Sequence, residues 1–149
     1  MTSALDVRPK RRVLVVENHR FFRENLVNWI SQQDELECCG EAGSVPDAQS
    51  AVKAQRPDVV LLDLSLDDST GFDLLHWLSA RESKLPVIVL SQHEESRFAT
   101  PALKAGARGY VSKDAATEEL HPAINAVLDG RCYVSGRGAF DAAGEPSGT

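Results

Sequence analysis

Residues 59–63 have the sequence Val59-Val60-Leu61-Leu62-Asp63, four large apolar residues followed at once by a carboxylate. Two other runs have the same form: Val13-Leu14-Val15-Val16 precedes Glu17, and Val87-Ile88-Val89-Leu90 precedes Ser91. Continuous apolar runs of this length, rich in β-branched residues, are typical of parallel strands covered on both faces of a sheet. The three runs therefore predict the interior of an α/β domain.

Weaker strand candidates and helical patterns lie between and beyond these runs. We expect the weaker strands at residues 36–41 and 109–112. Ser44, followed by Pro46, has the pattern of a helix N-cap. Apolar residues at helical spacing predict further buried helix faces. These residues are Phe22, Leu26, Trp29 and Ile30; Phe72, Leu75 and Leu78; and Leu120, Ile124, Val127 and Leu128.

Alternation of strands and helices predicts a five-stranded parallel sheet with helices on both faces. In such open sheets, ligands bind outside the carboxyl ends of the strands. Glu17, Asn18, Asp63, Ser91 and Lys113 all follow or end predicted strands, so we expect them to converge. Carboxylate oxygens suit Mg²⁺, and a carboxylate can attack phosphorus to form an aspartyl phosphate. One metal ion and one lysine can neutralise the charge in such a transfer.

Composition narrows the class of protein. The chain has 149 residues, a formal net charge of −6 and 42% hydrophobic residues, which fits one globular domain. The negative charge argues against direct binding of nucleic acid, and no apolar run is long enough to cross a membrane. Three cysteines without a disulfide pattern favour the cytoplasm. The histidines at positions 19, 76, 93 and 121 are scattered, and we expect solvated or half-buried imidazoles.

Four segments together resemble the receiver domain of two-component response regulators over roughly residues 12–130. His19, with the Gly130-x-x-Tyr133-x-Ser135 segment, is most similar to the NarL/FixJ branch. The resemblance predicts a doubly wound (βα)5, flavodoxin-like sandwich with strand order 2-1-3-4-5. The segments are Val13-Leu14-Val15-Val16-Glu17-Asn18-His19; Leu61-Leu62-Asp63-Leu64-Ser65 with Gly71 eight residues after Asp63; Val87-Ile88-Val89-Leu90-Ser91; and Ala105-Gly106-Ala107-Arg108-Gly109-Tyr110-Val111-Ser112-Lys113.

The resemblance also implies a role for several site residues. Asp63 is the expected phosphoacceptor for a phosphoryl group from a sensor histidine kinase or a phosphotransfer protein. Ser91 is expected to hydrogen-bond the phosphoryl oxygens, and Lys113 to pair with their charge. Tyr110 is the expected aromatic switch, which rotates inward when Ser91 moves.

The metal site departs from the family pattern. The resemblance implies that Glu17, Asp63 and the backbone carbonyl of Ser65 hold Mg²⁺. The second acidic position is Asn18, whose amide oxygen can coordinate Mg²⁺ but brings no charge, so we expect weak Mg²⁺ binding. Leu66-Asp67 replaces the usual Met-Pro, and Pro101 lies in the expected fourth helix, which should start late near Thr100 or be kinked.

We interpret residues 12–131 as the receiver domain, 1–11 as a polar lead-in and 132–149 as a C-terminal extension or linker. The expected function is a phosphoacceptor switch rather than an enzyme, in a stand-alone regulator or the receiver part of a transcription factor. It would control transcription through an effector domain or partner. The resemblance implies a phosphorylation-favoured homodimer, formed either through the first and fifth helices or through the face of the fourth helix, fifth strand and fifth helix. The alternative is a pseudo-receiver, an interaction module that acts without phosphorylation.

Overall fold

The computed structural model describes residues 9–65, 71–92 and 99–141. Within these residues, one sheet has the strand order β2-β1-β3-β4-β5-β6-β7. Its first five positions confirm the predicted order 2-1-3-4-5, and every pair among them is parallel. The strands are β1 (Arg11–Val16), β2 (Leu36–Ala42), β3 (Val59–Asp63), β4 (Val87–Ser91), β5 (Gly109–Ser112), β6 (Cys132–Val134) and β7 (Gly138–Phe140).

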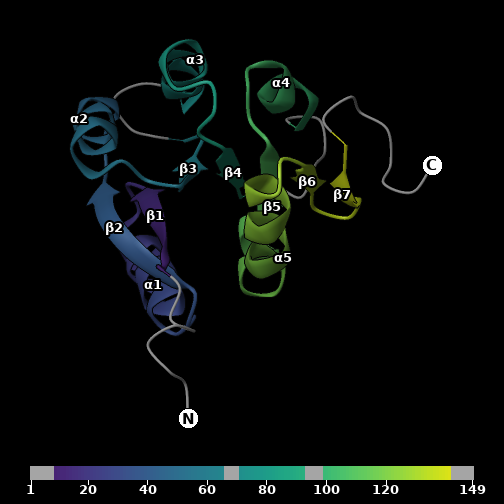
Figure 1. Ribbon diagram of the computed structural model, residues 1–149, viewed down its shortest axis with the longest axis horizontal. Helices are drawn as coiled ribbons and strands as arrows, with labels where there is room; N and C mark the ends of the chain where they lie inside the picture. Colours follow the sequence, from purple (N-terminus) through teal and green to yellow (C-terminus); the bar gives the residue numbers. More distant parts are fainter. Residues whose placement is uncertain (1–8, 66–70, 93–98, 142–149) are drawn as a thin grey trace.

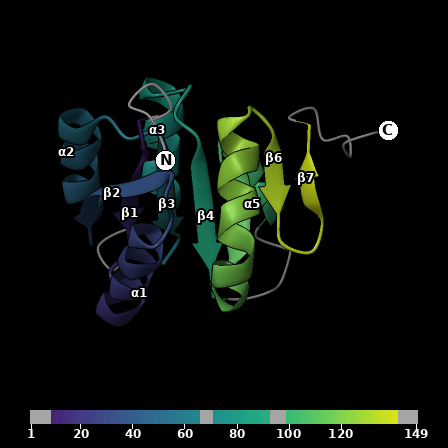
Figure 2. The ribbon, with the colours of Figure 1, turned by 60° about the horizontal axis from the view of Figure 1, so that its bottom comes forward.

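Helices cover both faces of the sheet, as predicted. In Figure 1, α2, α3 and α4 lie above the sheet and α1 and α5 below it, and Figure 2 brings α1 and α5 to the front. The helices are α1 (Arg20–Ser31), α2 (Val45–Gln55), α3 (Gly71–Arg81), α4 (Ala99–Lys104) and α5 (Ala116–Leu128), with a short 3-10 helix, η3 (Lys113–Ala115), before α5.

The strand pattern divides the core into two layers. Leu14 and Val16 pack in the cluster that faces α2, α3 and α4, whereas Val13 and Val15 pack against α1 and α5. Successive side chains of a strand point to opposite faces, so a continuous apolar run fills both layers. Both sides of the central strands are buried for this reason, and the polar residues that end them are brought to one edge of the sheet.

Two helix starts, those of α2 and α4, bear on signals noted in the sequence. The Ser44 hydroxyl accepts a hydrogen bond from the Asp47 backbone N–H at 3.3 Å, which confirms the predicted N-cap of α2. The described part of α4 begins at Ala99 and includes Pro101 in its first turn. The prediction of a late start or a kink depends on residues 93–98, which lie outside the described residues.

The sheet extends further than we predicted. Residues 132–134 pair in parallel with β5, and residues 138–140 pair antiparallel with β6, so this part of the expected extension or linker belongs to the sheet. Cys132, Val134 and Phe140 are buried in one core layer and Tyr133 in the other. β5 would otherwise leave unpaired backbone groups at the edge of the sheet. Three-residue strands carry too short a periodic pattern to be recognised in the sequence.

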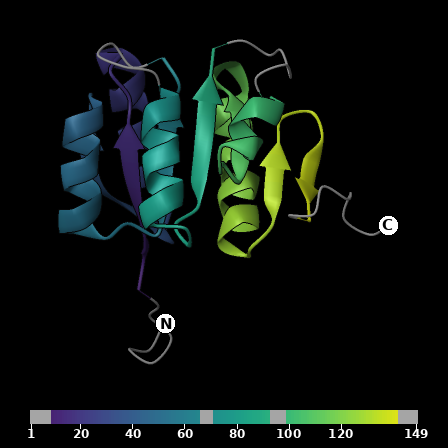
Figure 3. The same ribbon diagram turned by 90° about the horizontal axis from the view of Figure 1, so that it is seen from above.

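The parallel strands end at a common edge, shown at the top of Figure 3. Glu17, Asp63 and Ser91 are at the carboxyl ends of β1, β3 and β4, and Lys113 directly follows β5. The fold therefore brings these predicted residues to one edge. No helix within the described ranges combines the length and the apolar character needed to span a membrane.

Candidate functional site

Two carboxylates are buried at the strand ends. Glu17 is 0% exposed and Asp63 is 1% exposed. Glu17 follows β1, Asp63 ends β3, and β1 and β3 are adjacent and parallel. A buried carboxylate is costly unless cations or hydrogen-bond donors compensate its charge. The partners of these two side chains therefore define the site.

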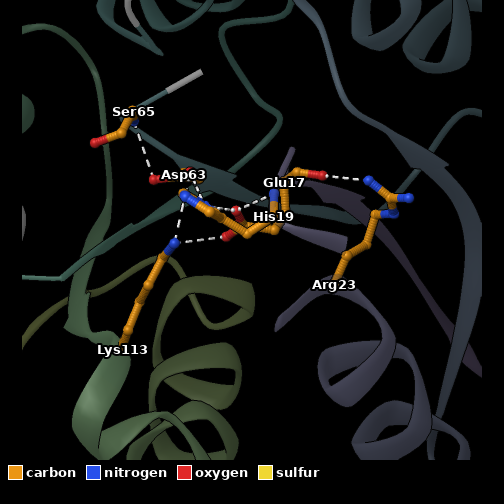
Figure 4. Close-up of polar contacts among 6 residues, drawn as sticks. All are labelled: Glu17, His19, Arg23, Asp63, Ser65 and Lys113. Carbon is orange, nitrogen blue, oxygen red and sulfur yellow. Dashed lines mark hydrogen bonds and ion pairs between the residues drawn. The ribbon is translucent and has the colours of Figure 1, made fainter. Parts of the chain in front are cut away.

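Lys113 provides one compensating cation. Its side chain is 7% exposed, and its Nζ lies 2.8 Å from Glu17 Oε1 and 3.5 Å from Asp63 Oδ2. The aliphatic side chain reaches the carboxylates beside the ring of Phe22, whose centroid lies 4.7 Å from Nζ. Figure 4 shows Lys113 directed from the end of β5 toward both acids. The predicted convergence of Glu17, Asp63 and Lys113 is thus observed.

His19 also belongs to this cluster, which the sequence reasoning did not anticipate. Its Nδ1 lies 2.9 Å from Glu17 Oε2 and 3.6 Å from Asp63 Oδ2. Its backbone N–H donates to Glu17 Oε2 at 3.0 Å. The ring is about half exposed, so the site meets solvent on this side. The sequence contained one signal for this contact, the spacing. His19 lies two residues after Glu17, in the loop that follows β1.

Backbone contacts hold the loop that follows Asp63. The Ser65 backbone N–H donates to Asp63 Oδ1 at 3.0 Å, and Gly71 N–H donates to the Leu64 carbonyl at 2.8 Å. A Cβ on Gly71 would lie 2.6 Å from Leu64 Cα and 2.8 Å from the Asp63 carbonyl oxygen. Only glycine permits this close approach of the two backbone segments. The spacing of Gly71 eight residues after Asp63 therefore has a steric cause.

Arg23 supports the other side of the site from α1. Its Nη1 donates to the Glu17 carbonyl at 2.8 Å, and its Nε donates to Glu41 Oε1 of β2 at 3.2 Å. Figure 4 shows the contact of Arg23 with the Glu17 carbonyl, to the right of Glu17. Arg23 therefore positions the backbone of Glu17, and among the described residues it makes no contact with Asp63. The sequence reasoning did not single out Arg23.

The two buried carboxyls differ in pKa. Burial raises the pKa of Glu17, but Lys113, with hydrogen bonds involving His19 and Asp63, outweighs burial and leaves that pKa below its ordinary value. Burial is also the main influence on Asp63, where it combines with the Glu17 carboxylate to raise the pKa against the Ser65 N–H and Lys113. Two adjacent carboxylates resist simultaneous ionisation, and an added cation would relieve that resistance.

Buried oxygens without hydrogen bonds indicate where a cation fits. Within the part of the chain that the structure describes, Asp63 Oδ2 and Asn18 Oδ1 are both buried and accept no hydrogen bond. A carboxylate oxygen and an amide oxygen of this kind are suitable ligands for a hard divalent cation. The carboxylates of Glu17 and Asp63, with the His19 ring nitrogen, form a group whose ligand atoms all lie within 4.8 Å of one another. The donor set present therefore fits a divalent cation.

The remaining predicted residues lie close to this cluster in the fold. Asp63 pairs in register with Leu90, so Ser91 is the next residue along the neighbouring strand, and it is 7% exposed. Tyr110 is 2% exposed and packs in the core layer of α2, α3 and α4. The Leu66-Asp67 departure lies outside the described residues. The structure thus assembles Glu17, Asp63 and Lys113 by direct contacts, and places Ser91 and Tyr110 on adjoining strands.

Comparison with known proteins identifies the family. The family model described as the response regulator receiver domain matches residues 13–125. The chain is 38% identical over 128 residues to the DNA-binding transcriptional activator DevR/DosR of Mycobacterium tuberculosis, covering 86% of this chain and 59% of that protein. It is 32% identical over 124 residues to the response regulator GacA of Pseudomonas aeruginosa, covering 83% and 58%. The chain thus spans under two thirds of the length of these relatives.

Solved structures give the same assignment. The signal receiver domain of the response regulator NarL from Mycobacterium tuberculosis has a TM-score of 0.77 at 31% identity, covering 83% of this chain and all of that one. A LuxR-family two-component response regulator from Aurantimonas has a TM-score of 0.78 at 29% identity, covering 83% and 88%. The chain belongs to the response regulator receiver domains and is of the NarL/FixJ type.

Proposed function

We propose that this receiver domain is a phosphoacceptor switch in which Asp63 receives a phosphoryl group. The observation that carries the proposal is the buried contact set of Asp63, with Lys113 Nζ 3.5 Å from an oxygen that accepts no hydrogen bond. Such an oxygen is available for a new bond. The other oxygen, Oδ1, is held by the Ser65 N–H, which orients the carboxylate.

The proposed reaction is phosphoryl transfer from a phosphohistidine of a sensor histidine kinase or a phosphotransfer protein. The Asp63 oxygen forms a bond to phosphorus, the P–N bond of the donor breaks, and the electron pair leaves with the imidazole nitrogen. Positioning and charge neutralisation provide most of the catalysis in such transfers. Lys113 would pair with the charge of the phosphoryl group, and the Ser91 hydroxyl would donate a hydrogen bond to it.

We assign the divalent cation to the same pocket. Glu17, Asp63 and the Ser65 carbonyl would hold Mg²⁺, with the Asn18 amide oxygen as a neutral ligand that weakens the binding. Bound Mg²⁺ would supply charge neutralisation for the incoming phosphoryl group. Asn18 Oδ1, buried and without a hydrogen bond, supports its inclusion in the donor set.

The phosphodonor would approach through the mouth of the site. A hollow of about 400 Å³ is lined by six residues that include His19, Gln92 and Lys113. Phe21 lines this hollow, and its side chain is 77% exposed. Among the described residues, it is the one large apolar residue that is exposed. An exposed aromatic ring beside a polar opening suits a transient protein contact.

The output would pass through Tyr110 and the surfaces around β5. The Tyr110 ring is already buried in this conformation, which matches the inward position that the resemblance associates with the switched state. We propose control of transcription through an effector domain or partner, as DevR/DosR is a transcriptional activator. A homodimer would use the α1 and α5 side, because β6 occupies the edge of β5. Light scattering with and without a phosphoryl mimic tests this association.

Labelling with acetyl phosphate and Mg²⁺, followed by mass spectrometry, tests the function. We expect one added phosphoryl group on the chain, absent in Asp63→Asn and retained in Asp73→Asn, which changes an exposed aspartate of α3. Mapping of the group to Asp67 or Asp68 would contradict the assignment. Absence of any labelling would favour the pseudo-receiver, which the family relationship does not favour.

A further inference from the structure

His19 occupies a position that a metal ligand would occupy. Its Nδ1 is 2.9 Å from Glu17 Oε2 and 3.6 Å from Asp63 Oδ2. In a six-coordinate site with bonds of about 2.1 Å, adjacent ligand atoms lie about 3 Å apart and opposite ones about 4.2 Å. The separation from Glu17 Oε2 matches adjacent ligand positions, and the separation from Asp63 Oδ2 lies between the two values. An ion bonded to the two carboxylates would therefore have the His19 nitrogen within reach of its coordination sphere.

The pocket lacks one carboxylate where Asn18 stands, and His19 is the adjacent residue. We propose that His19 Nδ1 is a ligand of the divalent ion in this pocket, so that the site takes a first-row transition-metal ion in preference to Mg²⁺. This proposal rests on the proposed function for the location of the ion. Imidazole nitrogen suits transition metals, whereas Mg²⁺ prefers oxygen and retains its waters.

Two features of the pocket favour this role over a simple hydrogen bond. Asp63 Oδ2 is buried and lies beside the same ring nitrogen, and within the described residues neither that nitrogen nor Lys113 Nζ, 3.5 Å away, forms a hydrogen bond to it. The His19 backbone N–H donates a hydrogen bond to Glu17 Oε2 at 3.0 Å, which holds this carboxylate oxygen beside the His19 ring. Figure 4 shows the ring beside both acids.

Binding of an ion at Nδ1 has a simple proton balance. The hydrogen bond to Glu17 places a proton on Nδ1, and the ion would take its place. The displaced proton moves through solvent to Nε2, which is accessible because the ring is about half exposed, so the imidazole stays neutral and no net proton is released. Lys113 approaches Glu17 through the other carboxylate oxygen, Oε1, and does not occupy the contact of His19 with Oε2.

The test measures binding of Mn²⁺ and Mg²⁺ to the full unphosphorylated chain by calorimetry. His19→Gln keeps an amide that can donate to Glu17 but removes the ring nitrogen. We expect it to weaken Mn²⁺ binding about tenfold or more, and Mg²⁺ binding less than about threefold. The control is His121→Asn, because His121 also contacts a carboxylate, Glu35 Oε1 at 2.7 Å, but far from the pocket in sequence and in the fold. This control should leave both affinities unchanged.

A direct spectroscopic readout accompanies the titration. Electron spin echo of bound Mn²⁺ should show coupling to an imidazole nitrogen that is lost in His19→Gln and kept in His121→Asn. Mn²⁺ bound without that coupling, or an equal loss of both metals in His19→Gln, would overturn the proposal. Absence of Mn²⁺ binding to the native chain would also overturn it. Acetyl-phosphate labelling of Asp63 is scored separately, so a failed metal assignment can be told apart from a failed phosphoacceptor assignment.

Discussion

Two carboxylate clusters of this domain are built in opposite ways. In the acidic pocket, Glu17 and Asp63 share Lys113 and His19, and Asp63 Oδ2 accepts no hydrogen bond. At the opposite side of β5, the Glu119 carboxylate of α5 accepts hydrogen bonds on both oxygens, from the Tyr133 and Ser135 hydroxyls, each at 2.7 Å. The acidic pocket has more acceptor oxygens than hydrogen-bond donors among the described residues, whereas both carboxylate oxygens of Glu119 accept a hydrogen bond.

The pairing of Glu119 has a structural consequence. The Ser135 hydroxyl oxygen also accepts the Ser112 backbone N–H at 3.0 Å, so one hydroxyl joins α5, the end of β5 and the residue after β6. Complete pairing of a partly buried acid stabilises the fold. Crowded acids with a free oxygen lower stability but can bind a cation or a phosphoryl group. The contrast fits a structural role for the Glu119 cluster and the function proposed for the acidic pocket.

The largest effect should come from one added methyl group beside the acidic pocket. Gly71→Ala places Cβ 2.6 Å from Leu64 Cα, so the backbone around Asp63 has to shift. We expect a loss of about 2–3 kcal/mol in the free energy of unfolding and loss of acetyl-phosphate labelling. Chemical denaturation and mass spectrometry measure both. Gly43→Ala is the control, because its nearest neighbouring atom would be 3.6 Å away and labelling should persist.

Removal of one carboxylate from each cluster should change stability in opposite directions. Glu119→Ala leaves the Tyr133 hydroxyl unpaired in a residue that is 8% exposed, and we expect a loss of about 1–3 kcal/mol. Asp63→Asn retains the acceptor for the Ser65 N–H and removes a crowded charge, so we expect a gain of about 1 kcal/mol. Urea unfolding in the absence of divalent metal measures both changes in the free energy of unfolding. A change of the same sign in Glu119→Ala and Asp63→Asn would contradict the contrast between the two clusters.

Addition of a carboxylate to the pocket should increase its affinity for Mg²⁺. Asn18→Asp adds one negative charge at a position whose amide oxygen is buried without a hydrogen bond. A gain of about tenfold in Mg²⁺ affinity follows from about 1–2 kcal/mol of extra attraction. Tryptophan fluorescence or calorimetry measures it. An unchanged affinity would show that the amide oxygen already serves as an adequate ligand.

The smallest effect is a shift in the titration of Tyr133. Burial, together with the hydrogen bond to and the charge of Glu119, raises the pKa of Tyr133 to about 12. The folded state therefore holds a proton that the unfolded chain loses near pH 10, so this contribution to stability should decline as pH rises from about 10 through 12. Glu119→Gln should lower the pKa toward its ordinary value. Absorbance of the phenolate in the Tyr110→Phe background reports it, and an unchanged pKa would exclude Glu119 as a cause.

Much of the fold could be predicted because its signals are local. The run of residues 59–63 is buried on both faces as its continuous apolar character indicates, and Ser44 caps α2 through its own side chain. The convergence of Glu17, Asp63 and Lys113 followed from the rule that parallel strands end at one edge. The β6–β7 hairpin could not be predicted in this way, because its strands are stabilised by pairing with β5 and by Glu119 rather than by a pattern of their own.

His19 marks the limit of sequence reasoning within the site itself. Its position two residues after Glu17 was visible, but the direction of its ring depends on the backbone of the β1–α1 loop and on the location of Asp63. The sequence alone determined the order of strands and helices, the buried runs and the identity of the acids, because these depend on side-chain type and spacing. Only the tertiary structure decided which acid oxygens remain unpaired, which cation meets them and how β5 is covered, because those outcomes depend on contacts between residues far apart in the chain.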